Sequence, residues 1–306
     1  MMRLLVATDL LPKSESAIDR AGLLADELDA ELSLLHVVSP VSSERVLEQS
    51  LQMAIARMKS RVRSPLWRAR TIPDVVVRAG NPARVMLETI AREEPDLLIV
   101  GPHERRGVVD ALQGTIIEKV VSARRCPVLV VQQNASANYR QVLLALDVAA
   151  GSRAAVRAAE RLVLRDGARA AAIHACTSPD HAVLQLPGTE GSGVALHTDC
   201  SAGTVSAAMR ELLEQESADP KRYDLIVSNG NPLPAIMRAI ETRQPDLLVL
   251  GTRGDGRMRR AVLGSVANQV LKLAPCDMLI VPQGTSEAST AHDAQRTGLS
   301  SAPMSA

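Results

Sequence analysis

Short apolar runs alternate with amphipathic stretches from the first residues of the chain onward. Apolar runs of four to eight residues are typical of buried strands, and apolar positions repeating every three to four residues are typical of helices. In the first half the pattern predicts strands at 3–8, 31–38, 71–79, 96–100 and 128–131. It predicts a helix capped by Ser14 and running to about residue 28, and further helices near 43–63, 82–92 and 115–123.

The second half repeats this order. It predicts strands near 141–146, 169–175, 224–228, 246–250 and 278–281, and helices near 152–164, 204–215, 232–241 and 266–272. Strands this apolar, alternating with helices, indicate parallel sheets covered on both faces. The fold class that follows is α/β, with two tandem doubly wound domains that each contain a five-stranded parallel sheet.

An internal repeat supports two copies of one fold. Residues 80–133 align with 230–283 at a constant offset of 150, without a gap. The shared positions are the Gly-Asn-Pro triplets at Gly80 and Gly230, the Pro-Asp-Leu-Leu runs at Pro95 and Pro245, and the pairs Gly101 and Gly251, Gly114 and Gly264, and Cys126 and Cys276. A repeat of this length indicates duplicated structural units. We therefore predict domains at 1–133 and 139–283, and a disordered tail at 284–306 that is rich in Ser, Ala and Thr.

An insertion distinguishes the second copy. Asp9 and His36 recur at Asp147 and His174 with an offset of only 138, so 12 extra residues precede Gly230, mostly within 178–203.

Composition excludes several classes of protein. Lys and Arg number 35 against 34 Asp and Glu, and the chain has no Phe, one Trp and two Tyr. Neither a basic field nor stacking aromatics are available for nucleic acid. No apolar run reaches the ~20 residues of a membrane helix, and no signal peptide is evident. Four cysteines do not indicate a disulfide framework. We expect a soluble cytoplasmic protein with no nucleic-acid or membrane partner.

Glycines in the second copy form a pattern with a chemical meaning. Gly251 is followed by two residues and Gly254, and then by nine residues and Gly264-Ser265. Glycines allow positive φ and expose backbone N–H groups, and a helix beginning at Ser265 would favour an anion. The pattern predicts a site for a phosphate chain at the carboxyl end of a strand. No Lys follows Gly-Ser, so this is not a Walker loop. The alternative is that the glycines only shape a long surface loop.

At these residues, at Asp147, and in the run from Gly264 to Cys276, the chain resembles the universal stress protein family over residues 2–132 and 140–283. The resemblance implies Rossmann-like, adenine nucleotide α-hydrolase-like domains that pair through their last strands as an internal pseudo-dimer, and a further homodimer of tandem chains. It also implies ATP, with Mg²⁺, in the second copy. Position by position, it implies Ala145, Asp147 and Ala175 beside the adenosine, and Gly251, Arg253, Gly254, Gly264, Ser265 and Val266 at the phosphates and ribose. Ala267 stands where the family often has a hydroxyl residue, and Asp147 also suits a simple helix or turn cap.

The first copy departs from the pattern at Glu104, which stands in the place of Gly254. A carboxylate there would face phosphates, and two unit charges ~4 Å apart at an effective dielectric of ~20 repel by about 4 kcal/mol. A bound Mg²⁺ or another rotamer would soften this repulsion. We predict a weakened or lost site, with binding through Asp9, Gly101, Gly114 and Thr115 as the alternative.

The other candidate residues match no known pattern of a metal or catalytic site. His174, Cys176, His181, His197 and Cys200 match no standard zinc spacing, and Cys126 and Cys276 suit packing positions. No catalytic Ser-His-Asp set or carboxylate pair stands out. The function we expect is an ATP-binding stress-response regulator that acts through protein–protein contacts, with at most slow ATP hydrolysis. The alternative is an interaction module that binds no nucleotide.

Overall fold

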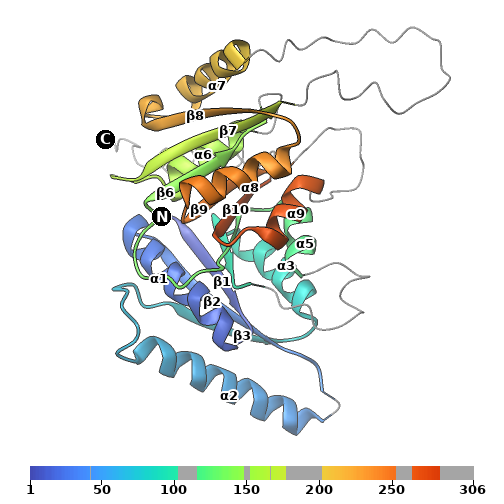
Figure 1. Cartoon of the computed structure of the whole chain (residues 1–306). Coiled ribbons are helices and arrows are strands. Elements are labelled where there is room, and N and C mark those ends of the chain that lie inside the picture. The colour runs from blue at the N-terminus through green and yellow to red at the C-terminus, as the bar shows by residue number, and fades with distance from the viewer. Residues whose placement is uncertain are drawn as a thin grey trace, which may run out of the picture.

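The computed structural model describes residues 1–41, 43–102, 116–147, 152–165, 167–176, 202–252 and 264–282. These residues form one ten-stranded sheet in the order β3-β2-β1-β4-β5-β10-β9-β6-β7-β8 (Figure 1). All neighbouring strands are parallel except β5 and β10, which are antiparallel. The expected fold class, two doubly wound five-stranded parallel sheets, is confirmed.

The elements of the two halves follow the same order. The strands are β1 (Arg3–Thr8), β2 (Glu31–Val38), β3 (Asp74–Ala79), β4 (Leu97–Val100), β5 (Val128–Val130), β6 (Gln141–Ala145), β7 (Arg169–Cys176), β8 (Tyr223–Asn229), β9 (Leu247–Gly251) and β10 (Asp277–Val281). The helices of the first half are α1 (Glu15–Leu28), α2 (Glu44–Arg63), α3 (Pro82–Glu93) and α5 (Ile116–Ser122). Those of the second half are α6 (Ser152–Leu162), α7 (Ala202–Glu216), α8 (Pro232–Arg243) and α9 (Ser265–Leu273).

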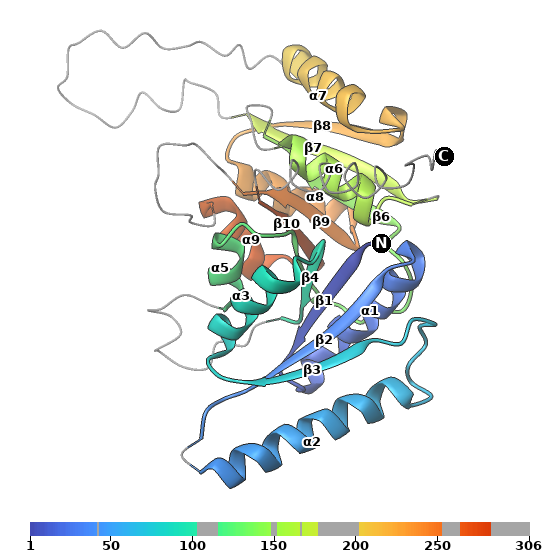
Figure 2. The same ribbon diagram turned by 180° about the vertical axis from the view of Figure 1, so that it is seen from behind.

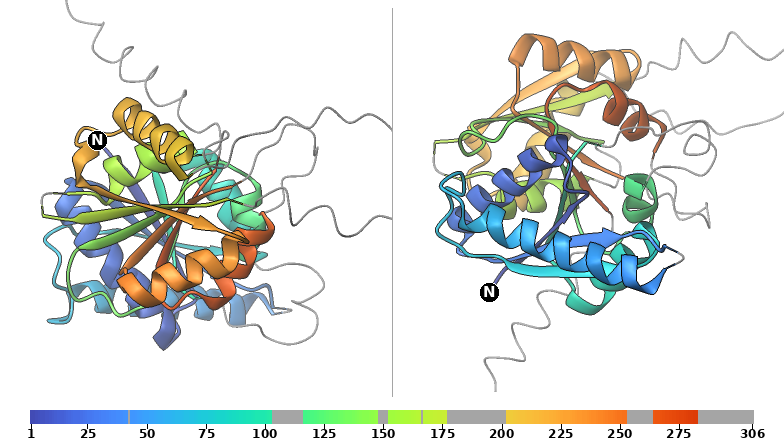
Figure 3. Two further views of the ribbon diagram at one scale, coloured as in Figure 1. Left: turned by 45° about the horizontal axis from the view of Figure 1, so that its top comes forward. Right: turned by 90° about the horizontal axis from the view of Figure 1, so that it is seen from below.

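Two hydrophobic clusters cover the two faces of this sheet. One contains buried residues of α1, α2, α6 and α7, and the other contains those of α3, α5, α8 and α9 (Figures 1 and 2). Along β1, Leu4 and Val6 face the first cluster while Leu5 and Ala7 face the second, as the alternation of side chains in a strand requires. Each cluster contains residues of both halves, so the two repeats share their cores. Helices α2 and α7 lie at the outer ends, beside β3 and β8 (Figure 3).

The antiparallel pairing of β5 with β10 joins the halves. Val130 lies opposite Met278, Leu129 opposite Leu279 and Val128 opposite Ile280. The expected pairing of the last strands is therefore confirmed, and one chain contains both members of the pair.

A buried carboxylate reinforces this junction. The side chain of Asp277, at the start of β10, is completely buried. Its Oδ1 accepts hydrogen bonds from the backbone N–H groups of Gln132 and Gln133 at 2.8 and 2.9 Å, and its Oδ2 accepts one from the Tyr139 hydroxyl at 2.7 Å. Arg20 of α1 lies 3.4 Å from Oδ2, with its guanidinium 4.0 Å above the Tyr139 ring. Burial, together with the charge of Asp277, raises the pKa of Tyr139 well above its usual value, so the phenol keeps its proton and donates. The segment 131–140 between β5 and β6, called the linker below, therefore meets α1 and β10 at one buried charge.

The shared motifs have structural roles. Gly80 and Gly230 adopt φ values of +149° and +110°, which few other residues tolerate, at the turns from β3 to α3 and from β8 to α8. Asp96 accepts the backbone N–H of Arg3 at 2.8 Å, and Asp246 accepts that of Gln141 at 3.1 Å, so each carboxylate ties two strands at their amino ends.

Two local expectations are wrong. The third strand begins at Asp74 and not at residue 71, because the backbone N–H and hydroxyl of Thr71 both donate to the carboxylate of Asp26 on α1. Ser14 occupies the N-cap position of α1 without capping it. Its hydroxyl instead donates to the Leu11 carbonyl at 2.8 Å.

Replacing Asp277 with Asn should destabilise the chain strongly, because the buried Arg20 would lose the carboxylate with which it forms an ion pair. We expect the free energy of unfolding to fall by about 3 kcal/mol, measured by urea denaturation followed by circular dichroism. Asp224→Asn is the matched control, since Asp224 pairs with Arg243 but its side chain is 70% exposed; this change should cost less than about 1 kcal/mol. Equal losses of stability in the two variants would contradict the structural role of Asp277 at the junction of the two halves.

Candidate functional site

The topology of the second half defines one crevice for a ligand. From β6 the chain builds outward through β7 to β8 and then returns to place β9 on the other side of β6. Ligands of such sheets bind outside the carboxyl ends of the strands at this switch point. Ala145, the last residue of β6, pairs with Ile173 of β7 and Leu250 of β9. Asp147 follows β6 and Gly251 ends β9, so the structure brings Ala145, Asp147 and Gly251 to the same edge.

Residues of the neighbouring strand complete one side of this edge. Ala175 lies one residue before the end of β7 and pairs with Ser228 of β8. The His174 ring places Nδ1 2.9 Å from the carbonyl oxygen of Leu146. Because a carbonyl only accepts, Nδ1 carries a proton, and the ring links the ends of β6 and β7. His36 makes the same contact with Thr8 at 2.8 Å in the first half, so this histidine is a repeated structural feature.

The turn after β6 is closed by a serine. The Asp147 backbone N–H donates to Ser152 Oγ at 2.6 Å, and the same hydroxyl donates to the Asp147 carbonyl at 2.7 Å. In the first half the corresponding carboxylate, that of Asp9, accepts the Leu11 N–H at 2.9 Å. A turn-forming contact of the kind considered for Asp147 is thus observed at Asp9, and Ser152 closes the turn after β6.

The next element described after β9 is helix α9. Gly264 is the N-cap of α9, which has no side-chain cap, and Ser265 and Val266 form its first turn. The first backbone N–H groups of a helix have no partner within the helix, and the helix dipole adds positive potential there. Such an end favours an anion. Arg253 and Gly254, and all of 253–263, lie outside the described residues.

Thr252 is a candidate that sequence reasoning missed. It directly follows Gly251, its side chain is only 2% exposed, and its hydroxyl has no hydrogen-bond partner. By alternation it lies on the same face as Leu250, which belongs to the cluster of α8 and α9. On α9 the side-chain oxygen of Asn268 is also buried without a partner. A copy comparison could have found Thr252, because the first half has Pro102, without a hydroxyl, at this position.

These features fit a phosphate group better than a metal site formed by the chain alone. Uncapped N–H groups and an unpaired buried hydroxyl are hydrogen-bond donors for an anion. Within the described residues no cluster of three or more His, Cys, Asp or Glu could hold a metal ion. Of the histidines and cysteines considered as zinc ligands, His181, His197 and Cys200 lie outside the described part of the chain.

The first half differs at its own switch point, between β1 and β4. Gly101 lies against the start of α1, where an added Cβ would come within 2.9 Å of the Ser14 Cα. This glycine therefore has a packing role whether or not a ligand binds. Glu104, Gly114 and Thr115 lie outside the described residues.

The cysteines fall into two kinds. Cys126 and Cys276 are free and 5% and 1% exposed, and burial raises the pKa of each thiol to about 12. This agrees with the packing role expected for them. Cys176, at the end of β7, is disulfide-bonded, a bond that the sequence analysis did not expect.

Comparisons with known proteins find one matching family and several similar chains. The model of the universal stress protein family matches residues 1–132 and 138–282. Universal stress protein A homolog 1 of Coxiella burnetii is 29% identical over 142 residues, covering 42% of this chain and 94% of that protein. Universal stress protein Rv2005c of Mycobacterium tuberculosis is 26% identical over 208 residues, 67% of each chain. The crystal structure of a universal stress protein from Archaeoglobus fulgidus has a TM-score of 0.69 at 18% identity, covering 92% of this chain and 98% of that one. Among the described helices, none is long and apolar enough to span a membrane.

Cys126 and Cys276 should resist alkylation while the chain is folded. With a pKa of about 12, only roughly one thiol in 10,000 is a thiolate at pH 8. Iodoacetamide treatment followed by mass spectrometry should find both unmodified in the native chain and both modified in guanidinium chloride. Rapid labelling of either one without denaturant would contradict their assignment as packing residues.

Thr252→Val should stabilise the ligand-free chain, because it removes a buried hydroxyl that lacks a partner. We expect a gain of about 1 kcal/mol in the free energy of unfolding, measured by urea denaturation. Thr242→Val serves as the control, because the Thr242 hydroxyl lies on an exposed residue and donates to the Arg238 carbonyl at 2.9 Å. Its effect should stay within about 0.5 kcal/mol. A loss of stability in Thr252→Val would show that the hydroxyl is not an unsatisfied group.

Proposed function

The chain belongs to the universal stress protein family, and on that premise we propose that it is a nucleotide-binding regulator of the stress response that holds ATP in its second half. In this proposal, ATP occupies the crevice outside β6 and β9. Occupancy changes a surface through which the protein contacts other proteins.

One observation carries the proposal. At the switch point of the second half, the unpartnered buried hydroxyl of Thr252 lies on the face of the sheet that α9 covers, and the N-terminus of α9 has no side-chain cap. A buried polar group without a partner costs stability, and a phosphate oxygen would satisfy it. The helix terminus favours the same charge. The Thr252 hydroxyl and the first N–H groups of α9 are therefore both hydrogen-bond donors suited to an anion. They belong to the region where doubly wound sheets bind ligands.

The roles of the site residues follow from their places on this edge. Ala145, Asp147 and Ala175 lie at the ends of β6 and β7 and would contact the adenosine. On the β9 side, the residues assigned to the phosphates and ribose are Gly251, Arg253, Gly254, Gly264, Ser265 and Val266. The negative charge of the triphosphate makes Mg²⁺ a natural companion, held mainly by phosphate oxygens.

The two halves would differ in affinity because of one residue. Gly254 puts no side chain at its own position in the second half, whereas Glu104 puts a carboxylate at the matching position in the first. A fixed negative charge near phosphates opposes binding by up to about 4 kcal/mol at close range. We therefore propose one functional nucleotide site in each chain.

The proposed output is regulation. The sequence offers no evident general base placed to activate water, so hydrolysis would be slow at most. Contacts with other proteins, and association of two chains as a homodimer, are part of the same proposal.

Gly254→Glu should abolish or strongly weaken nucleotide binding, because it reproduces the loop chemistry of the first half. Calorimetric titration with Mg-ATP should show affinity falling by at least about 100-fold relative to the parent chain. Gly203→Glu is the matched control: Gly203 is exposed on α7, and a Cβ there meets nothing within 4 Å. It should leave affinity unchanged.

The reciprocal variant sharpens the test. Glu104→Gly should not weaken binding and is expected to add a second, weaker site in the same titration. Parent-like affinity of Gly254→Glu in a folded chain would contradict the assignment of the site. The same is true of an equal loss in Gly203→Glu.

A further inference from the structure

The sheet has two end strands, and one of them, β3, pairs with β2 alone. In a parallel strand the N–H and C=O groups of one residue point to one side, and those of the next residue to the other. The N–H of Gly80, just after β3, donates to the Val38 carbonyl of β2 at 3.0 Å. By this alternation the backbone groups of Val75 and Val77 point away from β2. Outside the strand ladder, no hydrogen bond of the described residues uses them.

Helix α2 packs on one face of this end strand. Its buried residues Ala54, Met58 and Val62 belong to the hydrophobic cluster against which Val75 and Val77 pack, and α2 contacts β2 as well as β3. The helix therefore covers side chains on a face of the sheet. The backbone groups along the outer edge of β3 are left for a further strand, as is usual for a strand at the end of a sheet.

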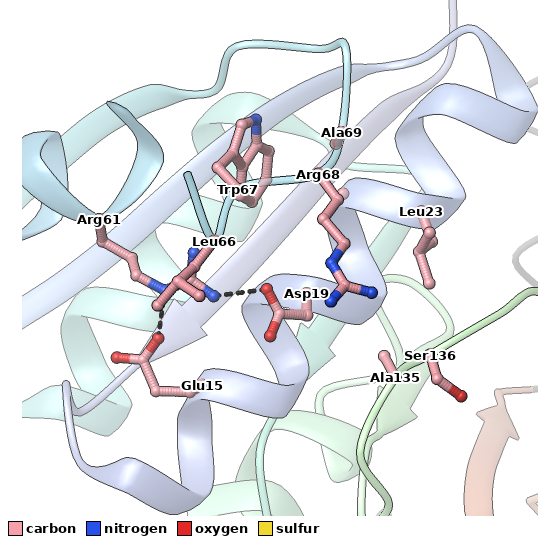
Figure 4. A pocket seen from close by; sticks show the side chains of 11 residues that line it. Glu15, Asp19, Leu23, Arg61, Leu66, Trp67, Arg68, Ala69, Ala135 and Ser136 are labelled. Carbon is pink, nitrogen blue, oxygen red and sulfur yellow. Dashed lines mark hydrogen bonds and ion pairs between the residues drawn. The ribbon is translucent and has the colours of Figure 1, made fainter. Parts of the chain in front are cut away.

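The connection from α2 to β3 is held on α1. Near the end of α2, Arg61 donates to Glu15 and Asp19 of α1 at 2.6 and 2.5 Å, as Figure 4 shows. The indole of Trp67 lies so close to α1 that a Cβ added to Gly22 would be 2.8 Å from its Cη2. Because α1 packs on β1 and β2, these contacts hold the connection toward the inner strands of the sheet.

The charges of β3 form a self-complementary pattern. Asp74 and Arg78 lie on the same face of the strand as Val76, because side chains alternate along a strand. Four residues of a strand span about 13 Å, so Asp74 and Arg78 are too far apart to pair with each other. Within the described residues, no hydrogen bond or ion pair holds either side chain. A second copy running antiparallel would bring opposite charges together.

The other end strand lacks this pattern. β8 ends the sheet in the same way, and its Asp224 stands at the position of Asp74 in the repeat. Asp224 already pairs with Arg243 of α8 at 2.8 Å. Ser228 stands at the position of Arg78. Of the two end strands, β3 therefore offers the better match to a second copy of itself.

We propose that two copies of the chain associate through antiparallel pairing of their β3 strands, centred on Val76 and related by a twofold axis. Val75 exchanges N–H···O=C hydrogen bonds with the partner's Val77, and Val77 does so with the partner's Val75. Asp74 faces the partner's Arg78 in a non-hydrogen-bonded pair, the kind that brings side chains closest. Moving the centre to Val75 or Val77 would keep backbone pairing but separate the charges.

This pairing specifies a surface for the homodimer that is part of the proposed function. It does not rest on nucleotide binding, because β3 is the end strand of the sheet and lies apart from β6 and β9. Loss of association and loss of ATP binding are therefore separate observations.

Charge reversal tests the pairing in solution. Sedimentation velocity of the parent chain should show a reversible dimer with a dissociation constant on the order of 10 µM. Asp74→Arg and Arg78→Asp each place like charges opposite one another, and each should weaken association at least about tenfold. The double variant exchanges the two charges and should regain association like that of the parent. Glu211→Arg, at an exposed position on α7, should leave association unchanged.

A cysteine at the centre of the pairing tests the register. Val76→Cys should form a covalent dimer when oxidised with copper phenanthroline. The two Cα atoms of such a pair lie ~4.5 Å apart, within the range of a disulfide. Ile226→Cys, at the matching position of β8, should remain uncrosslinked on a non-reducing gel. Cys126 and Cys276 are buried, so they should not compete in either variant.

Circular dichroism checks that each variant is folded. The proposal is overturned if the parent chain stays monomeric at ~1 mM, or if both folded single variants associate as the parent does. It is also overturned if the double variant does not regain association, or if Ile226→Cys is crosslinked as efficiently as Val76→Cys. A dimer that leaves Val76→Cys uncrosslinked uses another surface and equally contradicts it.

Discussion

The junction between the two halves of the chain depends on the buried carboxylate of Asp277. A charge removed from water is tolerated only when it is paired and hydrogen-bonded. Here its partners come from three places: Arg20 on α1, Tyr139, and two backbone amides of the linker. The repeat itself does not contain this arrangement, because Pro127 stands at the position of Asp277 and Ala158 at that of Arg20 in the other copies. The linker is thereby bound to the β5–β10 junction, and the two sheets continue into each other.

Much of the fold could be predicted from the sequence, because helices and strands give the apolar residues a periodic spacing along the chain. Alternation of apolar runs with amphipathic stretches located the strands and helices, and the offset of 150 paired the two halves. The contacts that were missed join residues far apart in the chain and carry no period. Thr71 bonds to Asp26 and shortens β3, Ser14 bonds to Leu11 instead of capping α1, and Asp277 collects its partners across more than 130 residues.

The candidate site was predicted in part for the same reason. Glycine spacing pointed to the loop after β9 and to the start of α9, since glycine is a visible signal in a sequence. The topology adds the reason why these positions meet Asp147 and Ala145, namely the return of the chain from β8 to β9 beside β6. A buried hydroxyl without a partner cannot be predicted from one copy alone. Only the contrast between Thr252 and Pro102 would have suggested it.

Duplication has allowed the halves to diverge around one shared core. The second half keeps the glycine pattern, and the first half carries Glu104 in the place of Gly254. We propose that only one half of the chain holds nucleotide. Equilibrium dialysis of the full chain against radiolabelled ATP with Mg²⁺ measures this directly as the number of nucleotides bound at saturation. We expect one bound nucleotide for each chain. A value of two would show that Glu104 does not exclude phosphate, and a value of zero would show that the crevice at β6 and β9 is not a nucleotide site.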